Sequence, residues 1–126
     1  MRLVFDTGAL IALERNDRAS WLRLKSAFLA SETPITHGGV VGQAWRGSDP
    51  RSALLSKALS GFDVRSLDED LGRRAGELLA RSKKSDVIDG ALVLLAYDGD
   101  TIVTSDIGDI QTLARAAGRF VDLIEA

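Results

Sequence analysis

The chain contains no cysteine, and this absence excludes two classes of site. Neither a disulfide bond nor a thiolate metal site can form without cysteine. A cysteine-free chain suits a reducing compartment, and we expect a cytoplasmic location. Histidine is nearly absent too, since His37 is the only one. General acid–base catalysis by a pair of histidines is therefore excluded. We expect His37 itself on a loop or at the surface.

The sequence also lacks a long apolar run. The apolar stretch near Met1 is far too short for a signal peptide. No stretch approaches the roughly 18 apolar residues needed to span a membrane, so we expect a soluble chain with no membrane contact. An excess of positive charge is missing as well, because 16 Lys and Arg against 18 Asp and Glu give a net charge of −2. Bulk charge therefore neither supports nor excludes an RNA substrate.

What is present is the composition and pattern of one globular domain. The chain has 126 residues, 45% of them hydrophobic, which predicts a single domain over residues 1–126. Short β-rich runs alternate with helical patterns, which predicts an α/β fold with a central, mainly parallel sheet covered on both faces. The expected strands are 3–5, 34–36, 62–67, 101–104 and 120–124, and the expected helices are 7–13, 17–29, 40–45, 49–59, 68–79, 87–97 and 107–117.

Several aspartates have an ordinary structural explanation. Asp17, Asp49 and Asp68 stand where helices begin, so we interpret them as N-caps. Asp98 and Asp100 flank a glycine and indicate a turn. The pair of glycines at 38–39 is expected to separate the second strand from the helix that follows.

Other aspartates fall where ligands gather in parallel α/β proteins. Asp6 directly follows the first strand, Asp106 follows the run 101–105, and Asp109 lies three residues further on. The carboxyl ends of neighbouring parallel strands meet at one edge of the sheet, where binding sites form. Asp86 and Asp89, three residues apart, share one face at a helix start. The sequence thus brings several carboxylates within possible reach of one another.

Carboxylates brought together repel one another unless a cation lies between them. Oxygen ligands favour hard ions such as Mg²⁺ or Mn²⁺, and such an ion drives phosphodiester hydrolysis by activating water. Asp86, Asp89, Asp106 and Asp109 could each equally be a helix cap, since Asp is a common capping residue. Asp6 fits that explanation less well, because it lies between two apolar segments where an unpaired carboxylate would be costly. Spacing alone leaves both explanations open.

Three segments together resemble the PIN-domain family, and in particular the VapC toxins of VapBC toxin–antitoxin systems. LVFDTGALIA at 3–12 resembles the first strand, acidic residue and helix of that family. DVIDGALV at 86–93 resembles its central acidic helix, and TIVTSDIGDI at 101–110 its last acidic strand and turn. Their order and gaps also match, so the resemblance covers essentially the whole chain.

The resemblance implies a three-layer α/β/α PIN-like fold and a metal-dependent endoribonuclease acting on single-stranded RNA. It implies Mg²⁺, or Mn²⁺, as cofactor, structured RNA such as tRNA as substrate, a cognate VapB-like antitoxin that blocks the site, and a homodimer. By position, Asp6, Asp89 and Asp106 match the catalytic, metal-binding aspartates of the family. Asp109 matches an additional metal ligand, and Asp86 is an accessory neighbour.

One position departs from the family pattern. The family places a glutamate in a segment like 40–46, and Gln43 stands in that slot here. An amide oxygen can still contact a metal or a bound water, but it brings no negative charge. The substitution predicts weaker metal binding, and it keeps a second function open: a PIN-fold RNA- or protein-binding module with reduced or lost nuclease activity. A structural domain in which every aspartate is a cap is a third interpretation.

The remaining candidates each have two interpretations. Thr7 and Ser105 flank key aspartates, and their hydroxyls either orient a carboxylate or cap a helix. Arg46, Lys83 and Lys84 either contact RNA phosphates or belong to a solvated face. Trp21 and Trp45 are expected in the core or at an interface, and Trp45 could meet an antitoxin, as aromatic residues do at binding hot spots.

Overall fold

The computed structural model describes residues 1–47 and 49–126, and at residue 49 the backbone alone. The expected alternation of strands and helices is confirmed. In chain order the elements are β1 (Leu3–Phe5), α1 (Thr7–Glu14), α2 (Arg18–Leu29), β2 (Ile35–His37), α3 (Gly38–Ala44), α4 (Asp49–Leu59), β3 (Asp63–Arg65), α5 (Glu69–Ser82), α6 (Val87–Leu95), β4 (Thr101–Thr104), α7 (Ile107–Ala116) and β5 (Asp122–Glu125).

The strands form one sheet in the order β3-β2-β1-β4-β5, and every neighbouring pair is parallel. The prediction of a mainly parallel sheet is therefore confirmed. In β1 and β4, Val4 pairs with Ile102 and Phe5 with Val103. The carboxyl ends of these two strands consequently lie side by side at one edge of the sheet.

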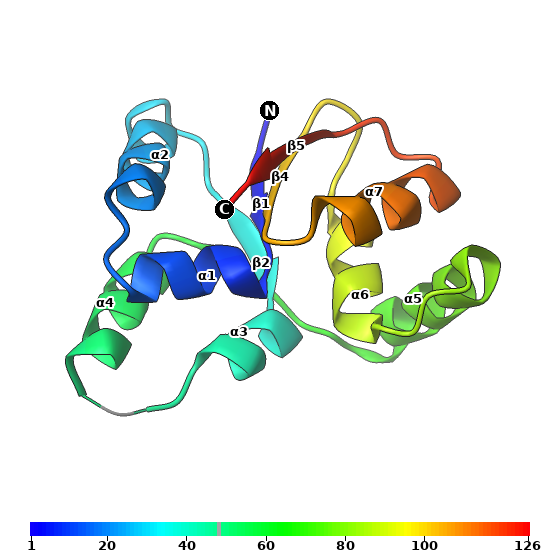
Figure 1. Cartoon of the computed structure of the whole chain (residues 1–126), viewed down its shortest axis with the longest axis horizontal. Coiled ribbons are helices and arrows are strands. Elements are labelled where there is room, and N and C mark those ends of the chain that lie inside the picture. The colour runs from blue at the N-terminus through cyan, green and yellow to red at the C-terminus, as the bar shows by residue number, and fades with distance from the viewer. Residues whose placement is uncertain (48) are drawn as a thin grey trace.

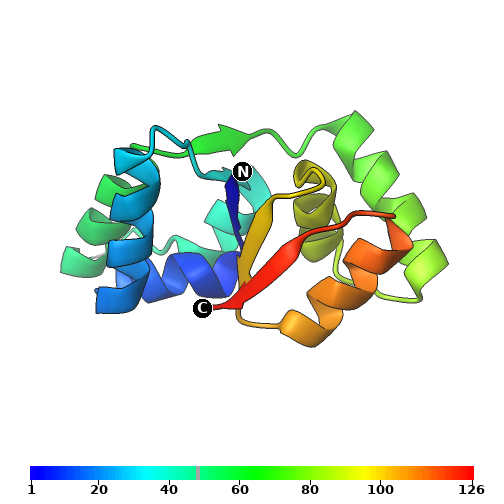
Figure 2. The ribbon, with the colours of Figure 1, turned by 90° about the horizontal axis from the view of Figure 1, so that it is seen from above.

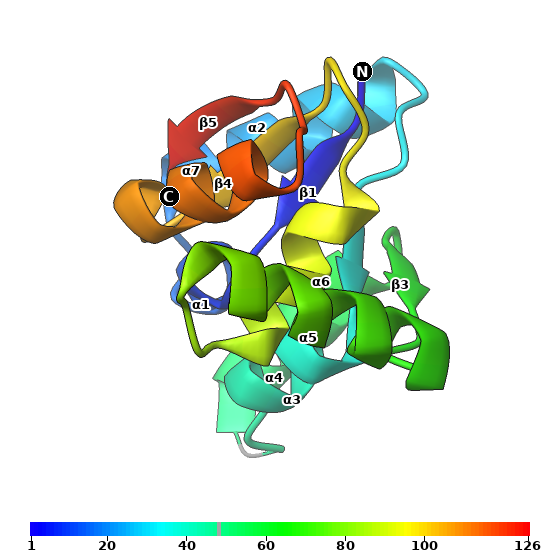
Figure 3. The ribbon, with the colours of Figure 1, turned by 90° about the vertical axis from the view of Figure 1, so that its right-hand side faces the viewer.

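Helices cover both faces of the sheet, which gives three layers. Figures 1 and 2 show α1, α2 and α4 on one side of the strands and α5, α6 and α7 on the other. Figure 3 shows α5 lying alongside α6, and α6 also contacts β1 and β2. None of the helices in the described part of the chain has the length and apolarity that a membrane span requires.

The strands next to the site are fully buried, so their positions are fixed by packing. Val4 and Phe5 of β1 and Ile102 and Val103 of β4 are at most 1% exposed. The Phe5 ring meets Phe62 edge to face, with 5.0 Å between ring centroids. This packing holds the ends of β1 and β4 in place. It therefore also fixes the backbone positions of the aspartates that follow these strands.

The predicted caps are confirmed wherever the side chain is described. Asp17 accepts a hydrogen bond from the Ser20 amide, and Asp68 accepts one from the Leu71 amide, each at 2.9 Å. The cap predicted at Asp49 lies outside the described residues. These contacts satisfy backbone donors that the first turn of a helix leaves unpaired.

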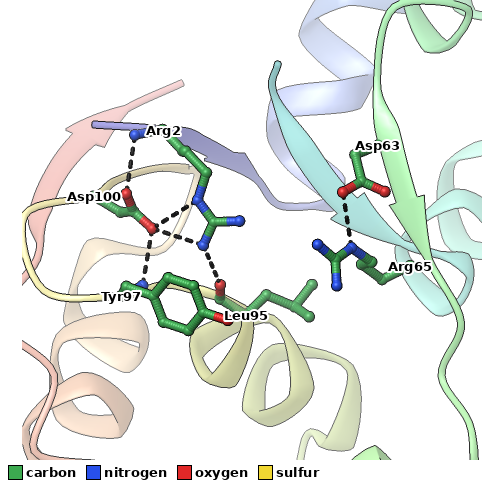
Figure 4. A network of polar contacts seen from close by, with 6 residues as sticks. All are labelled: Arg2, Asp63, Arg65, Leu95, Tyr97 and Asp100. Atoms are coloured by element: carbon green, nitrogen blue, oxygen red, sulfur yellow. Dashed lines mark hydrogen bonds and ion pairs between the residues drawn. The ribbon is translucent and has the colours of Figure 1, made fainter. Parts of the chain in front are cut away.

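The predicted turn at Asp98 and Asp100 is present, and Asp100 does more than turn the chain. Its carboxylate accepts hydrogen bonds from the Arg2 backbone, the Arg2 guanidinium and the Tyr97 amide, at 2.8 to 3.2 Å. Figure 4 shows this network, in which the Arg2 guanidinium also lies 4.6 Å from the centre of the Tyr97 ring. The network ties the start of β1 to the start of β4, at the opposite end of the strands from the predicted ligand site.

Among the predicted boundaries that differ from the structure, two were wrong because contacts distant in sequence set them. The helix predicted over 87–97 ends at Leu95, since the Tyr97 amide donates instead to Asp100. The last strand, predicted at 120–124, is Asp122–Glu125, and Phe120 lies in the preceding connection with 79% of its surface exposed. The Phe120 amide donates to Asp98 at 2.8 Å and not to a neighbouring strand.

The predicted break at Gly38 and Gly39 was also wrong, because both residues lie in the first turn of α3. A Cβ atom on Gly39 would stand 2.5 Å from Cδ1 of Ile88. Glycine therefore leaves room here for the tip of the Ile88 side chain of α6, a role that the sequence pattern of a turn cannot distinguish.

Candidate functional site

The predicted aspartates gather where the carboxyl ends of β1 and β4 meet the first turns of three helices. Asp6 is the N-cap of α1, Asp86 of α6 and Asp106 of α7, and Asp89 and Asp109 lie in the first turns of α6 and α7. We call these five residues the acidic cluster. Because helix N-termini carry partial positive charge, each carboxylate gains some stabilisation from its own helix.

Asp6 is the most rigidly held member of the cluster. It is 4% exposed, and it accepts hydrogen bonds from the Ala9 amide at 2.8 Å, the Thr104 hydroxyl at 2.6 Å and the Ser105 amide at 3.0 Å. These donors offset the cost of burying a carboxylate. They also fix the orientation of the Asp6 carboxylate relative to β4, so it can serve as a preset ligand.

The raised pKa of Asp89 shows that the other carboxylates lie close to it. Burial, followed by the charges of Asp86, Asp6, Asp106 and Asp109, raises the pKa of Asp89 to about 7. No described residue donates a hydrogen bond to the Asp89 carboxylate. Burial and the four neighbouring charges thus oppose the negative charge of Asp89, and a cation placed beside it would relieve that opposition.

Asp86 and Asp106 combine a structural role with a place in the cluster. Asp86 accepts from the amides of Ile88 at 2.9 Å and Asp89 at 3.2 Å, and Asp106 accepts from the Asp109 amide at 3.2 Å. The capping interpretation is therefore confirmed for both. It does not compete with a ligand role, since capping occupies one oxygen, Oδ1, of each carboxylate.

Asp109 is paired with a cation from another helix end. Lys84 Nζ lies 2.8 Å from Asp109 Oδ1, and the two side chains are 35% and 49% exposed. The hydrogen bond from Lys84 is the main reason that the pKa of Asp109 is lowered, and the same bond raises the pKa of Lys84. Lys84 thus brings a positive charge to the acidic cluster.

Lys83 and Lys84 both lie beside the cluster. A pocket of about 260 Å³ is lined by both lysines together with Asp86, Asp89 and Asp109. Arg46 is also exposed, but its guanidinium donates to the carbonyls of Gly42 and Trp45 at the end of α3, the helix that precedes it. The structure therefore places the two lysines, and not Arg46, in the lining of a pocket that the cluster shares.

Gln43 contacts the first helix of the site. The Thr7 hydroxyl donates a hydrogen bond to Gln43 Oε1, and Thr7 directly follows Asp6. The neutral side chain thus stands at the margin of the site, on the exposed surface of α3. Thr7 orients Gln43, whereas Ser105 contributes its backbone amide to Asp6.

Gly8 is a site residue that the sequence argument did not single out. A Cβ atom at this position would lie 2.1 Å from Ser105 Oγ and 2.4 Å from Ser105 Cβ. Only glycine lets the first turn of α1 approach the end of β4 so closely. The signal was present in the sequence as a glycine two residues after Asp6, but many helix starts tolerate glycine.

His37 contradicts the prediction of a loop or surface position. It lies in β2 and is fully buried. Its Nδ1 accepts from the Gly39 amide at 3.1 Å, so Nε2 carries the proton and donates to the Ile88 carbonyl at 2.9 Å. Burial lowers the pKa of His37. The neutral ring links α3, which carries Gln43, to the turn of α6 that carries Asp89.

The two tryptophans differ. Trp21 is partly buried against the core and its indole N–H donates to the Leu13 carbonyl at 3.0 Å, which confirms that it packs on the core. Trp45 is 38% exposed at the end of α3, so the core position is wrong for it. The predicted interface role of Trp45 stays a prediction.

The chemistry of the donor set fits a hard divalent cation. Every side chain of the acidic cluster offers carboxylate oxygens, and Asp89 faces the other four charges without a donor among the described residues. Among the described residues, no three acidic or histidine side chains converge closely enough to hold an ion by themselves. Mg²⁺ retains several waters and needs only one or two direct carboxylates, so the arrangement is compatible with an ion held partly through water.

The fold has a close counterpart among solved structures. No protein-family model matches this sequence, and no curated protein matches it either. A chain in the crystal structure of VapBC2 from Rickettsia felis, bound to a DNA fragment from the promoter, superposes with a TM-score of 0.70. The match covers 98% of this chain and 99% of that chain at 14% sequence identity. The resemblance to PIN-domain proteins of the VapC type is therefore confirmed at the level of the fold.

Proposed function

We propose that this chain is a VapC-like, divalent-cation-dependent endoribonuclease that hydrolyses RNA phosphodiester bonds. The observation that carries the proposal is the acidic cluster around Asp89, whose pKa is raised to about 7 by burial and by four neighbouring carboxylates. A fold tolerates such repulsion at a functional site more often than elsewhere. The fold shared with a VapBC2 chain adds a second, independent support.

Asp6, Asp89, Asp106 and Asp109 are the residues that would hold Mg²⁺ or Mn²⁺, with Asp86 beside them. When bound, the cation would supply activation of water and stabilisation of the leaving oxygen. The rigid Asp6 would present its carboxylate in a fixed direction, because three hydrogen bonds restrain it. Such preset orientation removes reorganisation from the reaction.

The lysines that line the pocket would bind the RNA backbone. Lys83 and Lys84 lie next to Asp86 and Asp89, so an ammonium group can meet a phosphate beside the acidic cluster. Hydrolysis then breaks the bond between phosphorus and the leaving ribose oxygen, and water adds to phosphorus. A single-stranded segment of a structured RNA such as tRNA is the proposed substrate.

A partner protein that restrains the nuclease would fit a second surface. A pocket of about 690 Å³ between α2 and α4 has Trp21, Leu22 and Phe28 among its lining, and Arg18, Lys25 and Lys57 also line it. We call it the α2–α4 groove. Apolar walls with cationic neighbours suit an amphipathic helix with an acidic flank. We propose that a VapB-like antitoxin places such a helix there.

The partner proposal is tested with a synthetic amphipathic helix that carries an acidic flank. Leu22→Asp should weaken its binding at least tenfold in calorimetry, because it buries a charge in the groove. Leu29→Asp is the matched control, since Leu29 is 79% exposed and outside the groove lining. Equal affinity for both variants would argue against the groove as the docking surface.

The neutral Gln43 supports a second candidate function, an RNA- or protein-binding module with weakened catalysis. Cleavage of bacterial total RNA by the purified chain separates the two functions. We expect cleavage with Mg²⁺ or Mn²⁺, none with EDTA, and none with Asp89→Asn. Asp63→Asn is the control, because Asp63 pairs with Arg65 on the edge strand β3 and is not in the cluster. RNA binding without cleavage under any of these conditions would favour the binding module.

A further inference from the structure

Lys84 reaches the acidic cluster from a helix end that is itself firmly held. The backbone turns at Lys83, whose φ of 58° places it in the left-handed region after α5. The Lys84 amide then donates to the Leu79 carbonyl at 3.3 Å. The backbone at Lys84 is thus hydrogen-bonded to the last turn of α5. Its long side chain stays flexible and can reach different partners.

The partner in this structure is an acid 25 residues away. Lys84 Nζ lies 2.8 Å from Asp109 Oδ1, in the lining of the pocket that also contains Asp86 and Asp89. The ammonium group therefore offsets part of the negative charge of the acidic cluster. It does so through the carboxylate of Asp109, one of the oxygens that a metal would use.

The ion pair between Lys84 and Asp109 is easily separated. Both side chains are about a third to a half exposed, so water competes for each partner. Ion pairs of this kind contribute little to stability because solvent screens them. A divalent cation carries twice the charge of one ammonium group, so it interacts with the acidic cluster more strongly than Lys84 does.

We propose that Lys84 is an internal counter-cation of the acidic cluster, which a divalent cation displaces from Asp109, so that the freed ammonium group binds an RNA phosphate. The inference rests on the proposed metal-dependent function. It makes cation binding and RNA binding cooperative, because the cation releases a lysine that is otherwise occupied. The same residue is thus a competitor of the metal and a ligand of the RNA.

The first test measures Mn²⁺ binding to the whole chain by calorimetry without RNA. Lys84→Met should tighten Mn²⁺ binding by up to about fivefold, because the competing ammonium group is gone. Lys83→Met, which removes the same charge from the adjacent residue, should change the affinity less than twofold, since Lys83 forms no ion pair with a described residue. Asp109→Asn combined with Lys84→Met should lose the gain.

The outcomes separate the inference from the function on which it rests. Wild-type protein that binds Mn²⁺ while Lys84→Met binds it equally or more weakly overturns the counter-cation and leaves the metal site standing. Absence of Mn²⁺ binding by the wild type and by both lysine variants overturns the proposed function, and the inference with it.

The second test measures the release of the lysine. Anisotropy of a fluorescein-labelled 2′-O-methyl oligoribonucleotide, which resists cleavage, gives RNA affinity with Mg²⁺ and with EDTA. Lys84→Met should weaken binding several-fold with Mg²⁺ and leave it unchanged with EDTA. Lys83→Met should act equally in both conditions. If Lys84→Met weakens RNA binding equally with Mg²⁺ and with EDTA, Asp109 does not keep the Lys84 ammonium group from the RNA.

Discussion

The Thr104 hydroxyl donates a 2.6 Å hydrogen bond to the Asp6 carboxylate, across 98 residues of sequence. The same Thr104 oxygen accepts from the Asp106 amide at 2.9 Å. One buried hydroxyl therefore fixes the carboxylate that follows β1 and the backbone of the acid that follows β4. The geometry between two of the proposed metal ligands depends on this oxygen.

Thr104→Val tests that dependence, because valine has the same shape but no hydroxyl. We expect a loss of about 1–3 kcal/mol in the free energy of unfolding, since Asp6 loses a donor and the Asp106 amide loses its acceptor. Mn²⁺ affinity should fall with it. Thr101→Val is the matched control on the same strand, where the hydroxyl donates, among the described residues, only to the Met1 sulfur at 3.4 Å. Urea unfolding measures the change in stability, and calorimetry measures the change in Mn²⁺ affinity. Similar changes in both variants would show that the Thr104 hydroxyl does not position the two aspartates.

Asp6→Asn should abolish Mg²⁺-dependent RNA cleavage and any growth inhibition on expression. Asparagine can still cap α1 through its amide oxygen, so the fold should survive with a loss of about 1–2 kcal/mol from the unpaired Ser105 amide. Circular dichroism checks the fold and a labelled RNA checks cleavage. A folded Asp6→Asn protein that cleaves at the wild-type rate would remove Asp6 from the chemistry.

Asp89 should make stability depend on pH in a direction opposite to that of an ordinary surface aspartate. Its pKa is raised from 3.8 to about 7 in the folded chain, so the folded state holds a proton that the unfolded state has lost. Stability should therefore fall as pH rises from about 4 to 7, by roughly 2 kcal/mol after allowance for partial exposure. Asp89→Asn should flatten this trend in urea unfolding at pH 5 and pH 8, and an unchanged slope would contradict the assignment.

The same ionisation governs cation binding. Because Asp89 must lose its proton to bind a metal, Mn²⁺ affinity should decline below pH 7, approaching tenfold per pH unit. Calorimetry at several pH values measures the slope. An affinity that stays constant between pH 5.5 and 7 would place Asp89 outside the cation site.

Gln43→Glu should tighten Mn²⁺ binding by up to about thirtyfold, the effect of one added charge at roughly 4 Å from a divalent cation in water. The new carboxylate can keep the hydrogen bond from Thr7, so the local structure need not change. Calorimetry compares the variant with the wild type. Unchanged affinity would show that Gln43 is a neighbour of Thr7 and lies outside the cation site.

Gly8→Ala should destabilise the chain by about 1–3 kcal/mol, because the new Cβ would overlap Ser105. Gly76→Ala, in the middle of α5 with open space around it, should instead stabilise by up to about 1 kcal/mol. The double change Gly8→Ala with Ser105→Gly should recover most of the loss, since Oγ and Cβ of Ser105 are gone. Thermal unfolding of the three variants tests the clash directly.

The order of strands and helices, the parallel α/β class and the placement of acids after β1 and β4 were all predictable from the amino-acid sequence. Those features follow from short-range rules, since hydrophobic periodicity, capping residues and turn residues act within a few positions. The order of three acidic segments was also enough to indicate the PIN-type fold, although the identity to the VapBC2 chain is 14%.

Which of these residues meet depends on the folding of the whole chain. It buried the single histidine between α3 and α6, paired Lys84 with Asp109, and surrounded Asp89 with four other charges. It also showed that Gly8 and Gly39 serve close packing and not turns. These arrangements depend on contacts between residues tens of positions apart. Local sequence patterns therefore do not predict them. The pKa of Asp89 is the clearest case, because it is set by groups from the carboxyl ends of two strands and the first turns of three helices.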